Sequence, residues 1–393
     1  TFMTDRSISL DDIRLRLNDL DDELLKLLSE RRKLSIEVAK SKVETSKPVR
    51  DAVREQQLLV KLINNGKDKY ELDAQYITKL FHTIIEDSVL LQQSYLQNLA
   101  NPQSRKPLAR VAFLGSKGSY SHLASREYFS RKNMELIELN CSHFKEVAST
   151  VESGHADYGV LPIENTSSGS INEVYDLLQH TTLYIVGELS QPIEHCLVAK
   201  NDIRLEDIKT LYSHPQPHQQ CSEFLSRLKD VTLESCASTA DAMKKVKDLD
   251  GDDVAAIGNA SSGKLYGLQP IQGNIANQTE NHTRFIVVAR KPVEVSTQIP
   301  AKTTLIMSTS QEAGSLVETL LILQRLGINM TKLESRPIMG NPWEEMFYVD
   351  LEAHLDSDNM QQAITELTAI TRHLKVLGCY PSENIKATQV KLS

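Results

Sequence analysis

Hydrophobic residues recur at alternating steps of three and four along the first part of the chain. The positions are Leu10, Ile13, Leu17, Leu20, Leu24, Leu27, Leu34 and Val38. This spacing predicts one long helix from Ser9 to Lys42 with an apolar stripe on one face. No Gly or Pro occurs before Pro48, and Ser9 with Asp12 fits a capping box at the helix start.

One charged residue interrupts the stripe: Arg31 takes the position between Leu27 and Leu34. Burying a guanidinium is costly unless an anion meets it. Lys42 lies about 20° around and roughly 16 Å along the same helix, so both cations can reach one small ligand. Arg14 lies roughly 25 Å away on another face, and only two antiparallel copies would bring it near Arg31. A plain dimeric coiled coil, with Arg31 reaching out to water, fits the same pattern.

Two further helices and no strand are expected before residue 100. The second helix begins near Asp51, which shares a face with Arg54 and Glu55. Asn64-Asn65-Gly66 is expected to end it. The third helix is expected from about Asp73 to Leu99.

Three segments of this region, Leu24–Arg32, Lys47–Asp51 and Ile84–Ser88, resemble the all-helical chorismate mutase family. The resemblance implies an interlaced helical dimer that rearranges chorismate to prephenate, a pericyclic reaction needing no base, nucleophile or metal. Matched by position, the family's site residues are Arg14, Arg31, Lys42, Asp51, Arg54, Glu55, Ser88 and Gln92. Taken alone, Ser88 and Gln92 would also fit a partly exposed helix face.

The resemblance also implies roles that suit these residue types. The arginines would grip the substrate carboxylates bidentately. Lys42 and Gln92 would donate to the ether oxygen, where charge develops as the bond breaks. Glu55 and Asp51 would hold the substrate hydroxyl and orient the cations.

The region after the polar, Pro-flanked segment Asn101–Pro107 alternates strand and helix patterns, which is typical of an α/β domain. Three polar loops each follow a predicted strand: Gly115–Tyr120, Glu164–Gly169 and Ser213–Gln220. Loops at the carboxyl ends of strands line the ligand crevice of open α/β sheets, where backbone N–H groups bind anions. None of them matches G-x-G-x-x-G, so a dinucleotide fold is not indicated.

Four stretches in order, Gly118–His122, Pro162–Gly169, Ser213–Pro217 and Thr283–Phe285, resemble the prephenate dehydratase domain over about residues 108–290. The resemblance implies two α/β lobes like a periplasmic binding protein, with prephenate in the cleft. Carbon dioxide and the ring hydroxyl leave together to give phenylpyruvate, so only a proton donor is needed. The family assigns that role to the position of Thr283. Further matched binding or supporting positions are Glu164, Asn165, Ser213 and Gln220.

Arg284 is expected to pair with a substrate or protein carboxylate. His218 stands where many relatives have an aromatic residue. It has i,i+4 spacing with His214, but two prolines disturb the helix that a zinc pair needs. Gly258–Leu265 approaches a P-loop but lacks its magnesium-binding hydroxyl, so a turn is expected there.

The C-terminal part has a βαββαβ pattern, which is ferredoxin-like and of a kind used for small-ligand regulation. Its expected elements are Thr304–Met307, Gly314–Leu326, Asn329–Arg336, Met346–Leu351, Met360–Thr371 and Val376–Gly378. It resembles the ACT domain of phenylalanine-regulated dehydratases. The regulatory stretches match Gly314, Ser315, Leu316 and Val317, and Glu334, Ser335, Arg336 and Pro337. Ser315 replaces the usual alanine, and the resemblance ties the loop of Trp343 to regulation.

Composition narrows the class of protein. At 393 residues the chain is too long for one core. A net charge of -8 argues against general binding to nucleic acid or to anionic membranes. Five scattered cysteines without a C-x-x-C pair suit a reduced, cytoplasmic protein. There is no run of apolar residues long enough to span a membrane.

Together the resemblances imply a cytoplasmic bifunctional enzyme without metal or other cofactor, acting on chorismate and prephenate and inhibited by phenylalanine. It is expected to form a homodimer or larger homo-oligomer. The expected domains are 1–100, 109–291 and 300–386, with a linker at 101–108. A dimeric aromatic-amino-acid sensor with a non-catalytic middle domain is the alternative, but it leaves Arg31 unexplained. Fusion to a prephenate dehydrogenase would require a dinucleotide fingerprint, which the sequence lacks.

Overall fold

The structure is a computed structural model that describes residues 9–104, 106–341 and 343–383. The chain divides into two compact units: the N-terminal helices with Ser296–Ile299, and the other described residues from Gln103 onward. The outer ends of the predicted domains, residues 1–8 and 384–386, and residue 105 of the predicted linker lie outside the described residues. No helix in the described part of the chain is long and apolar enough to cross a membrane.

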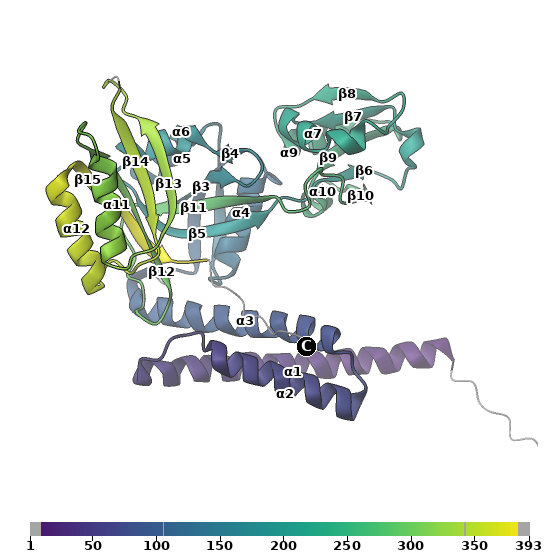
Figure 1. The fold of residues 1–393 in the computed structure, drawn as a ribbon. Helices are drawn as coiled ribbons and strands as arrows, with labels where there is room; N and C mark the ends of the chain where they lie inside the picture. The colour runs from purple at the N-terminus through teal and green to yellow at the C-terminus, as the bar shows by residue number, and fades with distance from the viewer. Residues whose placement is uncertain (1–8, 105, 342, 384–393) are drawn as a thin grey trace, which may run out of the picture. The chain divides into compact units, whose positions relative to one another are not determined.

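Three helices build the first unit (Figure 1): α1 Leu10–Thr45, α2 Ala52–Tyr70 and α3 Ala74–Ala100. The predicted cap of α1 is confirmed, since the Ser9 hydroxyl accepts a hydrogen bond from the Asp12 N–H at 3.1 Å. Asp51 and Asp73 cap α2 and α3 in the same way. These caps satisfy backbone donors that have no partner inside the helix.

The expected end of the second helix at Asn64-Asn65-Gly66 is wrong, because α2 continues to Tyr70. Gly66 is buried, and a Cβ at this position would lie 2.2 Å from Cδ1 of Ile77 in α3. The glycine therefore allows two helices to approach closely. Here packing outweighs the low helix propensity of glycine.

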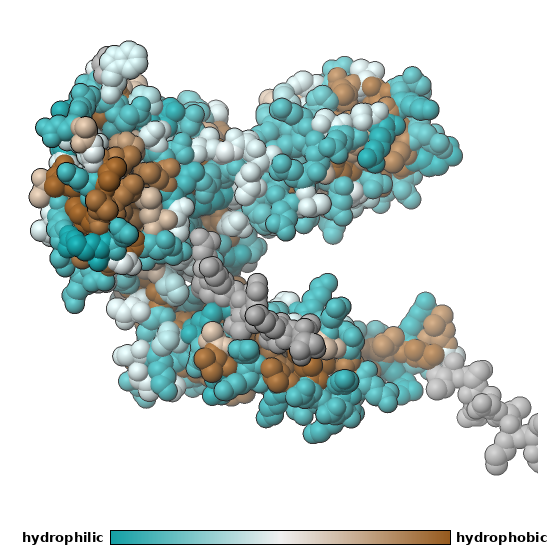
Figure 2. Space-filling model, viewed as in Figure 1, coloured by the Kyte–Doolittle hydropathy of each residue, from teal (hydrophilic) through white to brown (hydrophobic). Residues whose placement is uncertain are grey.

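The apolar stripe of α1 faces solvent in the single chain. All residues from Ser9 to Glu30 are exposed. Leu24, Leu27 and Leu34 are exposed by 56%, 61% and 65%. Figure 2 shows hydrophobic residues gathered along the part of α1 next to its N-terminal end. A continuous exposed stripe of this kind is typical of a protein–protein contact surface.

The second unit begins with two α/β lobes, as predicted. The first lobe has the sheet order β2-β1-β3-β11-β5, with β4 beside β3. Its strands are β1 Leu108–Leu114, β2 Glu135–Cys141, β3 Tyr158–Asn165, β4 Gly169–Ser170, β5 Tyr184–Pro192 and β11 His282–Ala289. Its helices are α4 Tyr120–Ser130, α5 Phe144–Glu152 and α6 Asn172–His180, preceded by the short turn Pro102–Ser104.

The second lobe has the sheet order β10-β6-β9-β7-β8. Its strands are β6 Cys196–Ala199, β7 Thr210–Ser213, β8 Thr232–Ser235, β9 Val254–Gly258 and β10 Gln269–Gln272. Its helices are α7 Pro215–Gln220, α8 Ser222–Leu225, α9 Thr239–Asp248 and α10 Ala260–Leu265, with a short turn at Leu205–Asp207. The turn expected over Gly258–Leu265 is wrong, because Asn259 caps the helix α10 there.

The C-terminal part confirms the predicted βαββαβ order. It consists of β12 Ala301–Thr309, α11 Ser315–Arg325, β13 Met330–Pro337, β14 Glu345–Leu351, α12 Asp358–Ile370 and β15 Thr371–Pro381. The sheet is antiparallel in the order β13-β14-β12-β15. The last strand is longer than the expected Val376–Gly378, since it continues beside the whole of β12.

This C-terminal sheet has two covered faces (Figure 1). Leu305 and Met307 of β12 pack under α11 and α12, whereas Ile306 between them joins the core of the first lobe. Alternate residues of a strand point to opposite faces, so β12 serves both cores. The expected boundary at 291–300 thus separates two domains that belong to one compact unit.

Candidate active sites

The helical unit brings two of its predicted site residues, Arg31 and Ser88, into contact, and Gln92 follows Ser88 one turn later on α3. The Arg31 guanidinium of α1 donates to the Ser88 hydroxyl of α3, and to the Ile84 carbonyl at 3.4 Å. Ser88 and Gln92 are each only 7% exposed. The Gln92 side-chain carbonyl is buried without a hydrogen-bond partner among the described residues. Burial lowers the pKa of Arg31, although nearby Asp87 raises it.

Lys42 lies near the C-terminal end of α1, eleven residues after Arg31. Its ammonium donates to the Val49 carbonyl, and burial lowers its pKa. Gln298 supports the same loop, because its carbonyl accepts from the Val49 N–H at 3.1 Å and its side chain donates to the Lys42 carbonyl at 2.7 Å. Sequence reasoning did not find Gln298, which is more than 200 positions away and has no motif.

The remaining predicted residues of the helical unit have different surroundings. Asp51 accepts from the Arg54 N–H at 3.0 Å as the cap of α2. The Glu55 carboxylate accepts from Arg50 at 3.2 Å, an arginine that sequence reasoning did not assign to the site. The Arg14 side chain is 66% exposed and lies 3.4 Å from a neighbouring carboxylate on α1. A single chain therefore does not bring Arg14 to Arg31.

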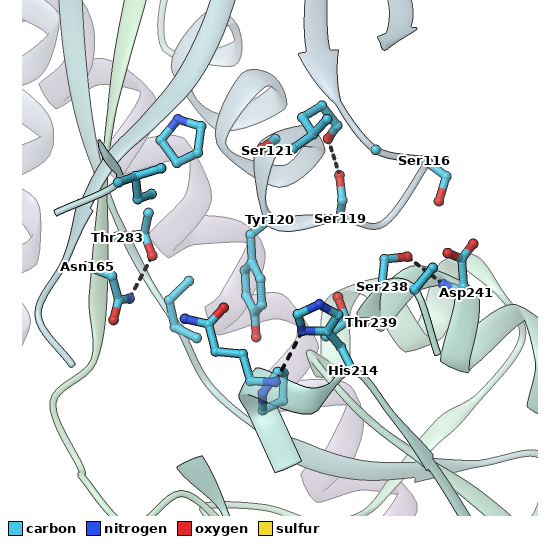
Figure 3. Close-up of a pocket in the computed structure, with 18 of the residues that line it drawn as sticks. Ser116, Ser119, Tyr120, Ser121, Asn165, His214, Ser238, Thr239, Asp241 and Thr283 are labelled. Atoms are coloured by element: carbon cyan, nitrogen blue, oxygen red, sulfur yellow. Dashed lines mark hydrogen bonds between the residues drawn. The ribbon is translucent and has the colours of Figure 1, made fainter. Parts of the chain in front are cut away.

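A cavity of about 770 Å³ lies between the two α/β lobes. Three predicted residues line it: Asn165 at the end of β3, Gln220 of α7 and Thr283 of β11. The other polar walls come from the loop before α4, from His214 and from the start of α9 (Figure 3). Strand ends and helix starts therefore meet here, as expected for an open α/β crevice.

Asn165 and Thr283 are direct cross-strand partners. The Asn165 side-chain oxygen accepts from the backbone N–H groups of Ser167 and Ser168 at 2.9 and 3.0 Å, which fixes the orientation of its amide. The amide NH₂ then donates to the Thr283 hydroxyl oxygen at 2.9 Å. The Thr283 hydroxyl therefore accepts from Asn165, and its own proton is available to a ligand in the cavity.

Gln220 belongs to a second group of hydrogen bonds. Its side-chain oxygen lies 2.7 Å from Nε2 of His195 and accepts from Asn281 at 3.4 Å. Asn281 in turn accepts from Asn165 at 2.8 Å. Burial lowers the pKa of His195, although its contact with Gln220 raises it. Because the Gln220 side-chain oxygen already has these partners, its NH₂ group is the part of the side chain that can donate to a ligand in the cavity.

Sequence reasoning missed His195 and Asn281. Both lie where the chain crosses between the lobes, outside the strand-to-helix loops that the sequence pattern marks. The one available signal was that Asn281 comes two positions before Thr283.

The charged and dipolar groups around this cavity are the Asp241 carboxylate, which disfavours an anion, and two helix N-termini, which favour one. No lysine or arginine of the described chain lines it. The N-termini of α4 and α9 do, capped by Ser119 and Ser238. Backbone N–H groups at helix N-termini favour negative charge. Burial lowers the pKa of His214, which also lines the cavity.

Three predicted residues of the middle domain are not among the residues that line this cavity. Ser213 is 4% exposed and donates to the His214 carbonyl at 2.8 Å. Glu164 and Arg284 line a second, smaller cavity of about 330 Å³ beside the C-terminal sheet. Arg284 was expected to pair with either a substrate or a protein carboxylate, and in this cavity it pairs with protein carboxylates. Substrate binding by these residues stays a prediction.

The predicted regulatory stretches lie at two places in the C-terminal sheet and its helices. Gly314 has a φ of +90° and precedes α11, where the Ser315 hydroxyl lies 2.6 Å from that of Ser310. Glu334 and Arg336 are on β13, and Arg336 forms two hydrogen bonds of 2.8 Å with Asp176 of α6. Trp343, in the loop before β14, is 95% exposed.

Comparison with known proteins identifies the family of both regions. Residues 13–93 match the family model "Chorismate mutase type II", and residues 111–293 match "Prephenate dehydratase". Curated bifunctional chorismate mutase/prephenate dehydratases are 56% identical in Enterobacter agglomerans, over 95% of this chain and 96% of that protein, and 55% identical in Escherichia coli K12, with the same coverage. A solved prephenate dehydratase from Arthrobacter aurescens, in complex with L-Phe, has a TM-score of 0.64 and 25% identity, covering 72% of this chain and 92% of that one.

The fold and the two sites define a two-activity enzyme with an all-helical and an α/β catalytic region. The chain belongs to the family of bifunctional chorismate mutase/prephenate dehydratases.

Proposed function

We propose that the cavity between the α/β lobes is the prephenate dehydratase site and that Thr283 is its proton donor. The observation that carries this proposal is the hydrogen bond from Asn165 to the Thr283 oxygen at 2.9 Å. It occupies the oxygen as an acceptor, so the hydroxyl can donate its proton to a ligand in the cavity. A hydroxyl held in this way is prepared to donate to a leaving group without reorienting.

The reaction follows from this geometry. The bond from the ring to its carboxylate breaks and releases carbon dioxide, and its electron pair completes the aromatic ring. The ring C–O bond breaks with its electrons on oxygen. This oxygen takes up a proton through the Thr283 hydroxyl and leaves as water, and solvent restores the threonine proton. The NH₂ group of Gln220 and the N-termini of α4 and α9 would hold the carboxylates.

The helical unit is proposed to rearrange chorismate to prephenate as a dimer. Arg31 and Lys42 would bind the substrate, and Gln92 would donate to the ether oxygen. Arg14 would come from the partner copy, because it is distant from Arg31 in its own chain. The exposed stripe on α1 supports a second copy as its cover. We also propose that the chain forms a homodimer or a larger homo-oligomer and that it is located in the cytoplasm.

Phenylalanine is proposed to inhibit the dehydratase by binding the ACT-like C-terminal domain. The L-Phe complex of the Arthrobacter aurescens protein supports this. The effector must bind two arrangements of the domain with different affinity, since otherwise it shifts no equilibrium.

The test is to give the purified chain chorismate alone and to quantify prephenate and phenylpyruvate. Phenylpyruvate above the spontaneous rate establishes both activities. Prephenate alone would reduce the middle domain to a binder, and unchanged chorismate would favour the aromatic-amino-acid sensor. Thr283→Ala should then abolish phenylpyruvate formation and leave prephenate formation intact. Arg31→Ala should abolish the mutase step but still convert supplied prephenate to phenylpyruvate.

A further inference from the structure

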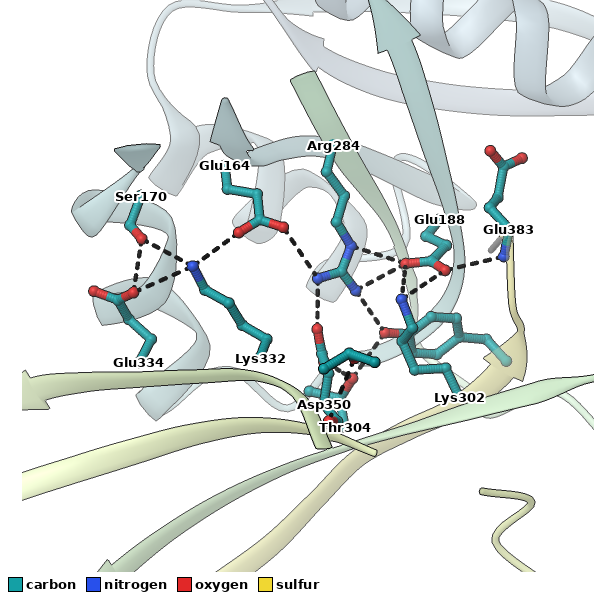
Figure 4. A network of polar contacts seen from close by, with 12 residues as sticks. Glu164, Ser170, Glu188, Arg284, Lys302, Thr304, Lys332, Glu334, Asp350 and Glu383 are labelled. Atoms are coloured by element: carbon teal, nitrogen blue, oxygen red, sulfur yellow. Dashed lines mark hydrogen bonds and ion pairs between the residues drawn. The ribbon is translucent and has the colours of Figure 1, made fainter. Parts of the chain in front are cut away.

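The two cross-strand pairs at the end of β3 and the start of β11 face opposite ways. Asn165 pairs with Thr283, and Glu164 pairs with Arg284. The first pair has its polar contact at the cavity between the lobes. The second pair points toward the C-terminal sheet (Figure 4). The backbone that fixes Thr283 is thus joined by single peptide bonds to side chains held on the other face.

Arg284 is anchored in the C-terminal domain. Its guanidinium donates to the buried Asp350 carboxylate of β14 and, at 3.1 Å, to the Tyr380 hydroxyl of β15. It also donates to Glu188 of β5 at 2.8 Å. Burial lowers the pKa of Arg284, but the surrounding carboxylates and tyrosines raise it further than burial lowers it. Removing one partner of such a buried pair leaves an uncompensated charge, so the guanidinium has little freedom to move.

Glu164 is anchored by a second contact to the same domain. Its carboxylate lies 2.8 Å from the Lys332 ammonium of β13. Lys332 is 3.4 Å from Glu334, which accepts from the Ser170 hydroxyl at 2.7 Å. Lys332, Glu334 and Arg336 alternate along β13, so they share one face. That face touches the first lobe, and it includes two residues of the stretch Glu334–Pro337 assigned to regulation.

We propose that Glu164 and Arg284 are positioning residues of the dehydratase site, which set Asn165 and Thr283 according to the arrangement of the C-terminal domain. This inference rests on the proposed dehydratase and its inhibition by phenylalanine. A shift of β13 or β14 would be passed through Lys332 and Asp350 to the residues next to the reacting pair. A misplacement of about 1 Å there costs roughly 100-fold in rate.

The first test separates positioning from substrate binding. Arg284→Lys and, as a milder change, Glu164→Gln are made in the full chain, and kcat and KM for prephenate are measured without phenylalanine. Positioning residues should lower kcat about tenfold or more with KM within about twofold. A raised KM with unchanged kcat would overturn the proposal and return both residues to substrate binding. If Arg284→Lys does not fold, Glu164→Gln alone decides.

The second test concerns the link to regulation. Lys332→Met removes the anchor of Glu164, whereas Lys375→Met is a matched control. Lys375 also joins the C-terminal sheet to the first lobe, but through the Thr181 carbonyl. Phenylalanine binding is measured by calorimetry and its inhibition by dehydratase rate. Lys332→Met should still bind phenylalanine, but the phenylalanine concentration needed for half-maximal inhibition should rise at least tenfold. Lys375→Met should be inhibited like the wild-type chain.

Equal inhibition in the two lysine variants, with binding intact, would overturn the proposed link. The wild-type chain distinguishes this failure from failure of the proposed function. If it forms no phenylpyruvate, the dehydratase assignment fails. If it forms phenylpyruvate but phenylalanine does not inhibit, the regulatory assignment and the link fail together, and the kcat and KM test still decides positioning.

Discussion

The amide of Asn165 donates to the hydroxyl oxygen of Thr283 at 2.9 Å across two neighbouring strands. In Asn165→Asp the carboxylate would accept the Thr283 proton and turn it away from the cavity. The bonds from Ser167 and Ser168 would survive, because one side-chain oxygen remains. We expect kcat for prephenate dehydration to fall about 100-fold or more. Mutase activity of the same sample is the control, and an unchanged dehydratase kcat would contradict the proton-donor role.

A second prediction concerns the origin of the mutase arginines. Arg14→Ala and Arg31→Ala should each be inactive as mutase. If the site takes one arginine from each copy, a mixed dimer restores one of its two sites, so an equal mixture allowed to exchange subunits should recover about one quarter of wild-type activity. A mixture that stays inactive would place both arginines in the same chain's site. Dehydratase activity of both variants serves as the control.

Stability should depend on the protonation of His195. Burial lowers its pKa below the ordinary value of 6.5. The unfolded chain therefore binds a proton more readily, and the free energy of unfolding should fall as pH drops below about 6.5. Above that pH both states are neutral at this position and the effect disappears. Thermal unfolding of wild type and His195→Gln at pH 5.5 and 8 tests this, and parallel pH profiles would count against it.

Gly378 should be intolerant of any side chain. A Cβ there would lie 2.1 Å from the Ile185 carbonyl oxygen, so β15 and β5 could not approach as they do. We expect Gly378→Ala to destabilise the α/β unit by about 1–3 kcal/mol. Gly273→Ala is the control, because no atom lies within 4 Å of a Cβ at that position. Calorimetric unfolding of both variants measures the difference.

The sequence was sufficient for the architecture because periodicity and caps agree with the packing. The helix starts at Ser9, Asp51 and Asp73, the alternating α/β region and the βαββαβ order follow from local patterns. The division of the α/β region into two lobes was implied only by the family resemblance. The error at Gly66 arose because close helix contact is a tertiary property. No local signal distinguishes a glycine that ends a helix from one that admits a neighbour.

The candidate sites were harder to predict, for two physical reasons. Arg284 follows Thr283 on a strand, so the two side chains must point to opposite faces, and only one can face the cavity. That rule could have separated Arg284 from Thr283 before the structure was known. For Asn281 the spacing of two residues from Thr283 was the only signal, and His195 had none, because the position of both depends on how two crossing segments meet.

The alternation along β3 and β11 also restricts how this chain can change over time. A substitution at any of these four positions leaves each side chain on its own face of the sheet. An insertion or deletion of one residue in either strand would instead turn that strand's member of the reacting pair toward the C-terminal sheet and its member of the anchored pair toward the cavity. The number of residues in these two strand segments is therefore constrained separately from the identity of their side chains, because the count alone decides which face each side chain takes.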